Sequence, residues 1–158
     1  QALRGIAHVA HLPPHIPERM REAAQARLHG FGKARIETRV LGDGQALGQG
    51  GAVVLWAELE AGVLGAARVA QRGVPAELLG EEAGAELAAD LAAGVTLDVH
   101  AADQALVYLA LAEGPSVFTV RQWSSHAATT ARLIGRFLPA RFSVVEEKVR
   151  VRIEVERH

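Results

Sequence analysis

A histidine preceded by two serines is the residue whose type and setting best suit nucleophilic chemistry. Ser124, Ser125 and His126 stand directly before a stretch with helical spacing of apolar residues. A serine at a helix N-cap accepts a hydrogen bond from an otherwise unpaired first-turn amide. His126 then lies in the first turn, where the positive end of the helix dipole disfavours its protonated form. A neutral imidazole can attack phosphorus, and the free amides beside it favour a phosphate. The alternative is an incidental surface histidine near a serine cap.

A second polar cluster lies at the predicted start of another helix. His100, Asp103 and Gln104 fall within about one helical turn, ahead of an apolar stretch. The carboxylate and the amide suit the hydroxyls of a ribose, and the imidazole offers a flat ring. The alternative is that Asp98 simply caps the helix and that His100 lies at the surface without a ligand.

Two further patterns do not predict a site. The glycine-rich residues 42–51 lack the Gly-Lys-Ser/Thr ending of a phosphate-binding loop and precede a strand rather than a helix, so they predict a flexible hairpin loop. His8, His11 and His15 lie close in sequence, but a strand followed by a turn points them in different directions. No carboxylate completes a metal site there, so we expect no metal ligands in this chain.

The first part of the chain predicts a β-α-β-β-β-α block. Alternating residues and turn signals predict strands over residues 3–12, 34–41, 52–59 and 63–69, and helical spacing predicts a helix over 17–28. Pro75 begins a long helix that runs to about residue 91. Its predicted apolar side consists of Leu78, Leu79, Ala83, Leu87 and Leu91.

The rest of the chain predicts an α-β-α-β-β block. The expected elements are a helix over 98–111, a strand over 117–120, a helix from Ser124 or Ser125 to Pro139, and strands over 141–145 and 149–155. We expect the first helix to bury Ala105, Leu106, Leu109 and Ala110, the second Leu133, Ile134, Phe137 and Leu138, and the last strand Val149, Val151, Ile153 and Val155. Strand and helix do not alternate strictly, so the pattern favours α+β over a doubly wound sheet. A boundary near Gly94 divides the chain into residues 1–93 and 94–158.

Composition limits the classes of function open to the chain. Its 158 residues are 49% hydrophobic and 22% charged, no window is apolar enough to span a membrane, and no cysteine is present for a disulfide or a thiolate metal site. We therefore expect a soluble, cytoplasmic protein with no membrane partner. Because Gln1 leads directly into a strand-like run, we also expect a fragment or processed piece of a longer chain.

Charge is unevenly distributed along the sequence. The net charge is −1, which argues against a protein that coats nucleic acid through a broad cationic face. Residues 1–120 carry 9 Lys and Arg against 14 Asp and Glu, a balance of −5, whereas residues 121–158 carry 8 against 4, a balance of +4. An anionic ligand is therefore expected at the C-terminal segment. The alternative is that Arg150, Arg152 and their neighbours only solvate an edge strand.

Several short motifs, in order along nearly the whole chain, are similar to those of one enzyme family. They are LPPHIPER (12–19), LWAE (55–58), RGVPAE (72–77), GEE (80–82), HAADQ (100–104), ALA (110–112), FTV (118–120) and HAAT (126–129), with Phe-Leu at 137–138. Together they resemble the C-terminal half of RNA 3'-terminal phosphate cyclases. The resemblance assigns residues 1–93 to the family's inserted small domain and residues 94–158 to the C-terminal part of its main catalytic domain.

The resemblance implies an ATP-dependent ligase of RNA processing. In that family a histidine becomes adenylated, the AMP passes to an RNA 3'-phosphate, and the neighbouring 2'-hydroxyl closes a 2',3'-cyclic phosphate. His126 matches the adenylated histidine, Asp103 and Gln104 match nucleotide-binding residues, and His100 matches a position where an aromatic ring often lies against adenine. A divalent cation, Mg²⁺ or Mn²⁺, would neutralise the phosphates of ATP.

The main departure from the family is the lack of its N-terminal half, which supplies arginines and an acidic metal ligand. We therefore expect the isolated chain to be inactive, to need that half as a partner, and to expose apolar surface on residues 95–158 when alone. Two alternatives remain. One is a non-catalytic cyclase-like protein of ribosome assembly, against which His126 argues, and the other is a binding domain with a decayed site.

Overall fold

The computed structural model describes residues 2–60 and 62–157, which form two compact units, Gln1–Leu91 (unit 1) and Ala92–His158 (unit 2). Each unit contains both helices and strands, so the α+β class predicted from the sequence is confirmed. None of the described helices is long and apolar enough to cross a membrane.

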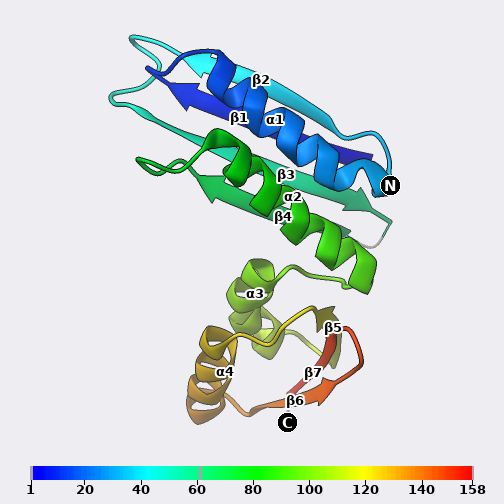
Figure 1. Cartoon of the computed structure of the whole chain (residues 1–158). Coiled ribbons are helices and arrows are strands. Elements are labelled where there is room, and N and C mark those ends of the chain that lie inside the picture. The colour runs from blue at the N-terminus through cyan, green and yellow to red at the C-terminus, as the bar shows by residue number, and fades with distance from the viewer. Residues whose placement is uncertain (1, 61, 158) are drawn as a thin grey trace. The chain divides into compact units, whose positions relative to one another are not determined.

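Unit 1 is a four-stranded sheet with two helices. The elements, in the predicted β-α-β-β-β-α order (Figure 1), are β1 (Ala2–Ala10), α1 (His15–Leu28), a 3-10 turn η1 (His29–Phe31), β2 (Arg35–Leu41), β3 (Gly50–Leu59), β4 (Gly62–Val69) and α2 (Ala76–Ala93). The sheet order is β2-β1-β3-β4, with β1 and β2 parallel and the other pairs antiparallel. Strand β3 begins at Gly50, inside the segment predicted as a loop, because Gly50 and Gly51 already pair with Ala10 and Val9.

The two helices of unit 1 cover the same face of its sheet (Figure 1) and pack closely through glycines. A Cβ atom built on Gly80 of α2 would lie 2.1 Å from the carbonyl oxygen of Met20 in α1, and one on Gly84 would lie 2.8 Å from the Cβ of Arg27. The prediction of the apolar side of α2 was wrong at Leu78, which is exposed. The buried side instead includes Gly80 and Gly84, because the absence of side chains there lets the helix backbones approach.

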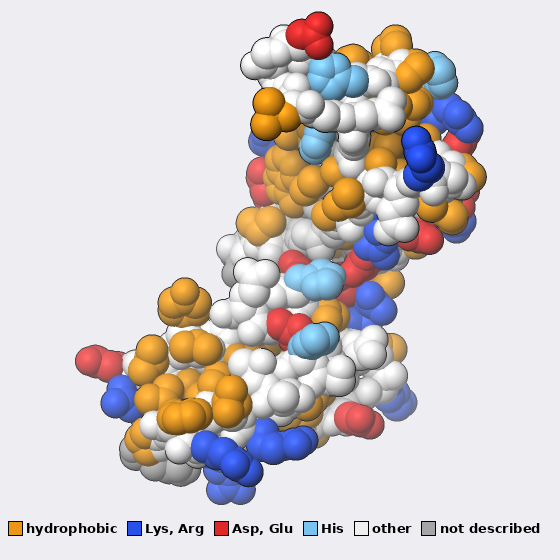
Figure 2. Space-filling view, turned by 90° about the vertical axis from the view of Figure 1, so that its left-hand side faces the viewer, with side chains coloured by type: hydrophobic (Ala, Val, Ile, Leu, Met, Phe, Trp, Pro, Cys, Tyr) orange, Lys and Arg blue, Asp and Glu red, His pale blue; other side chains and the backbone are white. Residues whose placement is uncertain are grey.

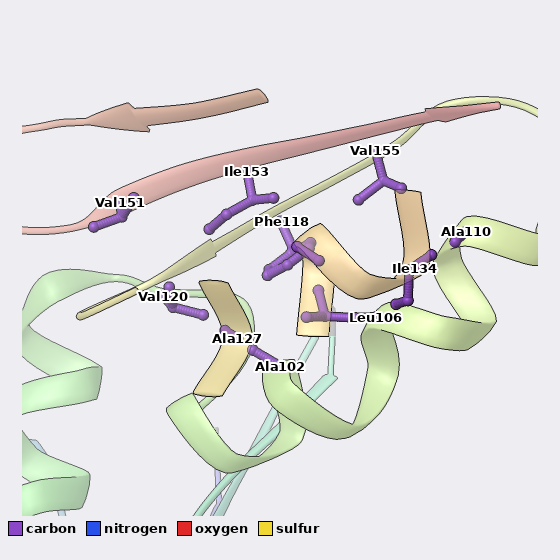
Figure 3. Close-up of a cluster of buried hydrophobic side chains, with 11 residues drawn as sticks. Ala102, Leu106, Ala110, Phe118, Val120, Ala127, Ile134, Val151, Ile153 and Val155 are labelled. Carbon is purple, nitrogen blue, oxygen red and sulfur yellow. The ribbon is translucent and has the colours of Figure 1, made fainter. Parts of the chain in front are cut away.

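Unit 2 is a three-stranded antiparallel sheet covered on one face by two helices, in the predicted order. The elements are α3 (Val99–Leu111), β5 (Ser116–Val120), α4 (Ser125–Phe137), β6 (Ala140–Glu146) and β7 (Val151–Arg157), with sheet order β5-β7-β6. Figure 3 shows their core, in which Val151, Ile153 and Val155 of β7 point toward the helices. The helices contribute mainly small side chains and the two larger residues Leu106 and Ile134.

The predicted apolar stripe of α4 was wrong in part. Ile134 is buried as expected, but Leu133 is 55% exposed and Phe137 is 79% exposed. The buried side of α4 consists of Ala127, Ala131 and Ile134, since the small residues let the helix lie close to β7. In α3 only Leu106 and Ala110 of the predicted set are fully buried, together with Ala102. Val149 was also assigned wrongly to the buried face of the last strand, because it lies in the turn before β7 and is exposed.

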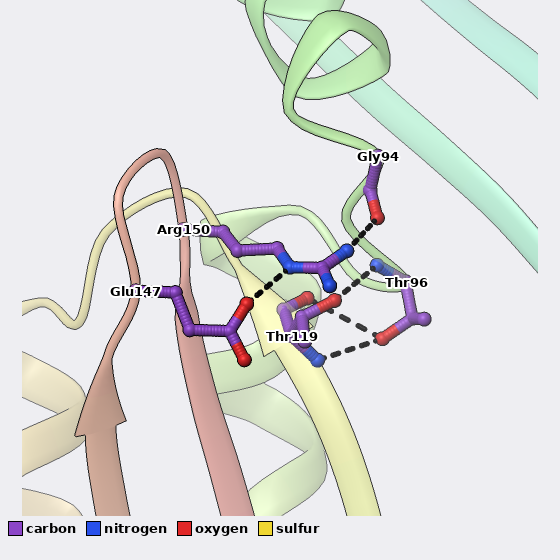
Figure 4. A network of polar contacts seen from close by, with 5 residues as sticks. All are labelled: Gly94, Thr96, Thr119, Glu147 and Arg150. Atoms are coloured by element: carbon purple, nitrogen blue, oxygen red, sulfur yellow. Dashed lines mark hydrogen bonds and ion pairs between the residues drawn. The ribbon is translucent and has the colours of Figure 1, made fainter.

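The segment that leads into α3 is fixed to the sheet of unit 2 by a polar network (Figure 4). Thr96 and Thr119 exchange hydrogen bonds, with the Thr119 amide donating to Thr96 Oγ1 at 2.8 Å and the Thr96 amide donating to Thr119 Oγ1 at 3.1 Å. Arg150 donates to the Gly94 carbonyl at 3.0 Å and to Glu147 at 2.7 Å. These bonds hold the chain on both sides of Val95 against the sheet, a few residues before the N-cap of α3 at Asp98.

Candidate functional site

Ser124 is the N-cap of α4. The sequence predicted either Ser124 or Ser125 at this position. Ser124 has an extended backbone, its hydroxyl accepts a hydrogen bond from the Ala127 amide at 2.9 Å, and its carbonyl accepts one from the Ala128 amide at 3.0 Å. Both halves of a serine N-cap are therefore formed. This cap fixes the direction in which the first turn of α4 leaves the loop.

His126 is the second residue of α4, and its side chain is exposed. The backbone amides of Ser125 and His126 donate no hydrogen bond to any acceptor among residues 2–60 and 62–157, whereas those of Ala127 and Ala128 are used by the cap. Free first-turn amides and the helix dipole favour an anion at this point. The ring is thus accessible, and it lies beside donors suited to a phosphate.

Asp103 ties α3 to the start of α4. The Ser124 hydroxyl donates a hydrogen bond to Asp103 Oδ1 at 2.8 Å while accepting the one from Ala127. Asp103 is partly buried and lies in the second turn of α3, so this bond brings the N-terminal ends of the two helices together. The carboxylate has a second oxygen, Oδ2, that accepts no hydrogen bond within the described part of the chain.

His100 and Gln104 lie on the exposed surface of the same end of α3. They are separated by four residues, which places them next to each other on one helix face, and both side chains are exposed. Asp98 caps this helix by accepting a hydrogen bond from the Ala101 amide at 2.8 Å. The bonded pair Asp103–Ser124 therefore connects the residues of the two predicted clusters, His100 and Gln104 on α3 and His126 on α4.

The described residues include no group of three or more His, Asp or Glu side chains that could hold a metal ion. Of the three histidines that lie close in sequence near the N-terminus, His11 uses its ring Nε2 in a hydrogen bond with the Ala46 carbonyl, 3.0 Å away. A cavity of about 480 Å³ in unit 1 is lined by residues such as Ile16, Arg72 and Val74, and it includes none of the four predicted site residues.

Two features of unit 2 were not predicted from the sequence. One is the double role of Ser124, because a cap can be inferred from spacing but its bond to Asp103 depends on how α3 and α4 pack. The other is a groove of about 500 Å³ between α4 and β6, which contains Trp123 and three arginines. The positive balance of residues 121–158 was the only signal of that groove in the sequence.

Comparison with known proteins identifies the family. Residues 1–92 match the sequence model of the insert domain of RNA 3'-terminal phosphate cyclase. The chain is 48% identical over 156 residues to the RNA 3'-terminal phosphate cyclase of Nitrosospira multiformis, an alignment that covers 99% of this chain and 44% of that protein. It is 41% and 42% identical to the proteins of that name from Pyrobaculum neutrophilum and Pyrobaculum aerophilum, with 98% of this chain and 44% of each relative covered. The chain thus spans less than half the length of these relatives, and it belongs to the RNA 3'-terminal phosphate cyclase family.

Proposed function

We propose that the protein containing this chain uses ATP to convert an RNA 3'-phosphate into a 2',3'-cyclic phosphate, with His126 as the nucleophile. The observation that carries the proposal is an exposed imidazole in the first turn of α4, beside the free amides of Ser125 and His126. Family membership and the names of the relatives support the substrate class. Unit 2 would belong to the catalytic domain, and the boundary at residues 93–94 is supported by the extent of the insert-domain match, residues 1–92.

The proposed reaction has three steps. First, the unprotonated nitrogen of His126 attacks the α-phosphorus of ATP, a phosphorus–nitrogen bond forms, and pyrophosphate leaves. Second, an oxygen of the RNA 3'-phosphate attacks the phosphorus of the histidyl-AMP, and the histidine leaves as the AMP passes to the RNA. Third, the 2'-hydroxyl attacks the 3'-phosphorus and loses its proton to solvent, the ring closes, and AMP leaves. Each step exchanges one bond to phosphorus for another.

The other residues of the site would bind the nucleotide. The first-turn amides of α4 would bind phosphate oxygens, and Oδ2 of Asp103 and the amide of Gln104 would bind ribose hydroxyls, with His100 against the adenine. Ser124 would hold Asp103 in register with His126 through its hydrogen bond. The described residues do not form a cage for a divalent cation. We therefore assign no step to the Mg²⁺ or Mn²⁺ expected with ATP.

The test is covalent labelling of the full-length protein with ATP labelled at the α-phosphate. We expect acid-labile label on the wild-type protein and none on His126→Ala, because the phosphorus–nitrogen bond cannot form without the imidazole. His15→Ala is the matched control, since it removes an exposed histidine of unit 1 and should leave labelling intact. The absence of label on the wild-type protein would leave the non-catalytic alternatives, and label on His126→Ala would mean another nucleophile.

Nucleotide binding is tested separately at Asp103. Asp103→Asn keeps an oxygen that can accept the Ser124 hydrogen bond but removes the negative charge. We expect it to raise the ATP concentration needed for half-maximal labelling while the maximal extent of labelling is retained. A loss of maximal labelling at saturating ATP would instead give Asp103 a part in the chemical step. The isolated chain of residues 1–158 is expected not to catalyse the cyclisation of RNA 3'-phosphates.

A further inference from the structure

We propose that the groove between α4 and β6 binds the RNA strand upstream of its 3' end, an inference that rests on the proposed function. The groove has a volume of about 500 Å³ and is open to solvent. Its lining residues are Trp123, Ala128, Ala131, Arg132, Gly135, Arg136, Ala140, Arg141, Phe142 and Val144. It begins at Trp123, three residues before His126, and it follows α4 toward its C-terminus.

The charged groups of the groove suit a polyanion. Arg132 and Arg136 lie one turn apart on α4, and Arg141 lies on β6 on the other side of the groove. None of the three has a hydrogen-bond or ion-pair partner among the described residues. Arg150 and Arg152 of the same unit, by contrast, each contact a glutamate. Unpaired guanidinium groups that converge on one groove are suited to binding phosphates.

The uncharged lining suits nucleotide bases. Trp123 is partly buried against the core of unit 2, and its indole N–H has no acceptor within the described part of the chain. Phe142 lies on the β6 side, and the floor carries only small residues at Ala128, Ala131 and Gly135. Proteins commonly bind single-stranded RNA with flat aromatic side chains beside a positively charged groove. Any base can stack on the aromatic rings, and the arginines contact the phosphates of the RNA backbone.

Charge at the molecular surface agrees with this assignment. Figure 2 shows Lys and Arg side chains gathered along the lower edge of the part of the surface that belongs to unit 2. This concentration accompanies the balance of +4 in residues 121–158 of a chain with net charge −1. An RNA whose 3' end lies at the N-terminus of α4 would meet two unpaired arginines farther along the same helix, Arg132 and Arg136.

The experiment measures binding of 5'-fluorescein oligoribonucleotides with a 3'-phosphate to the full-length protein by fluorescence anisotropy. Oligonucleotides of two, four and eight nucleotides are compared. We expect affinity to rise with length for the wild-type protein, and the triple variant Arg132→Gln, Arg136→Gln, Arg141→Gln to lose that rise. The slope of log affinity against log salt should fall by roughly 0.7 for each RNA phosphate that the variant no longer neutralises. Trp123→Ala should weaken binding of the eight-residue RNA about tenfold, because a base can no longer stack on the indole.

Lys148→Gln is the matched control, because it removes one exposed positive charge from the β6–β7 turn outside the groove. It should bind RNA as the wild-type protein does. If the triple variant also binds all three RNAs as the control does, the groove proposal is overturned. Destabilisation of the triple variant without a change in RNA affinity would equally overturn it, since the groove would then hold a segment of the protein itself.

A second measurement needs no variant. An RNA with 4-thiouridine three nucleotides from its 3'-phosphate is photocrosslinked to the wild-type protein, and the modified peptide is identified by mass spectrometry. Crosslinks to Trp123 or Phe142 support the groove, and crosslinks confined to other elements overturn it. Covalent labelling of the wild-type protein by ATP is scored apart from both assays. If the wild-type protein is not labelled, that result counts against the proposed function. Length-dependent RNA binding through the arginines would still support the groove.

Discussion

At the scale of single residues, His100 and His126 occupy equivalent positions. Each is the second residue of a helix with a formed N-cap, and each side chain is exposed. The hydroxyl of Ser124 caps α4 and also donates to Asp103. It therefore joins the first turn of α4, which contains His126, to α3.

Removal of the Ser124 hydroxyl should loosen the first turn of α4. Ser124→Ala deletes the acceptor of the Ala127 amide and the donor to Asp103, and loss of a serine cap costs about 1 kcal/mol. We expect the Ala127 amide to exchange with deuterium roughly fivefold faster in native-state hydrogen exchange. Ser125→Ala is the control, since the Ser125 hydroxyl makes no bond within the described residues. Equal protection of Ala127 in both variants would show that the cap is not needed.

At the scale of elements, helix type and order could be predicted from residue spacing, but the buried face could not. The spacing of Leu133, Ile134 and Phe137 predicts one apolar stripe, yet only Ile134 is buried. A helical wheel shows which residues are apolar, whereas burial depends on what packs on each side. Similarly, sequence spacing predicted the polar residues His100, Asp103 and His126 at two helix starts. Their connection through Ser124 required the packing of α3 against α4.

The packing of α1 against α2 depends on a glycine that the hydrophobic pattern did not identify. A methyl group at Gly80 would lie 2.1 Å from the Met20 carbonyl oxygen, so Gly80→Ala forces the helices apart. We expect a loss of about 1–3 kcal/mol, as for other overpacked cores, and a lower Tm in circular dichroism. Gly30→Ala is the control, because nothing lies within 4 Å of its Cβ position. A Gly80→Ala protein as stable as Gly30→Ala would contradict the close approach.

The same pair of helices is joined by an ion pair that should make unit 1 sensitive to acid. Arg19 Nε and Nη2 donate to the two oxygens of Glu77 at 2.5 and 2.6 Å, and these hydrogen bonds lower the pKa of the Glu77 carboxyl from its ordinary value. A lowered folded-state pKa contributes stability above the unfolded value, and this is lost as pH falls through the folded value. The difference in Tm between the wild-type protein and Glu77→Gln should therefore shrink as pH falls below the ordinary glutamate pKa of about 4.3. Glu60 is exposed and has no partner among the described residues. The Tm of Glu60→Gln should therefore change with pH in parallel with the Tm of the wild-type protein.

At the scale of the whole molecule, unit 2 exposes apolar side chains on the outer sides of its two helices. Tyr108 is 75% exposed and Phe137 is 79% exposed, and Val107, Leu111 and Leu133 are exposed as well. Figure 2 shows hydrophobic side chains gathered on the surface of unit 2. Exposed apolar patches of this kind mark surfaces that another part of a protein covers. Because the chain spans 44% of its relatives' length, we expect the remaining part of a full-length protein to cover this face.

The apolar face should be detectable with a hydrophobic dye. The isolated chain of residues 1–158 is expected to enhance the fluorescence of 1-anilinonaphthalene-8-sulfonate, and the double variant Tyr108→Gln, Phe137→Gln to do so much less, since the two rings are largely in water. Leu47→Gln is the control, because Leu47 is a fully exposed residue of unit 1 outside the strands. A full-length protein should bind less dye than the isolated chain. Equal dye binding by the double variant and the control would mean that α3 and α4 do not form this surface, and equal binding by the full-length protein would mean that it stays uncovered.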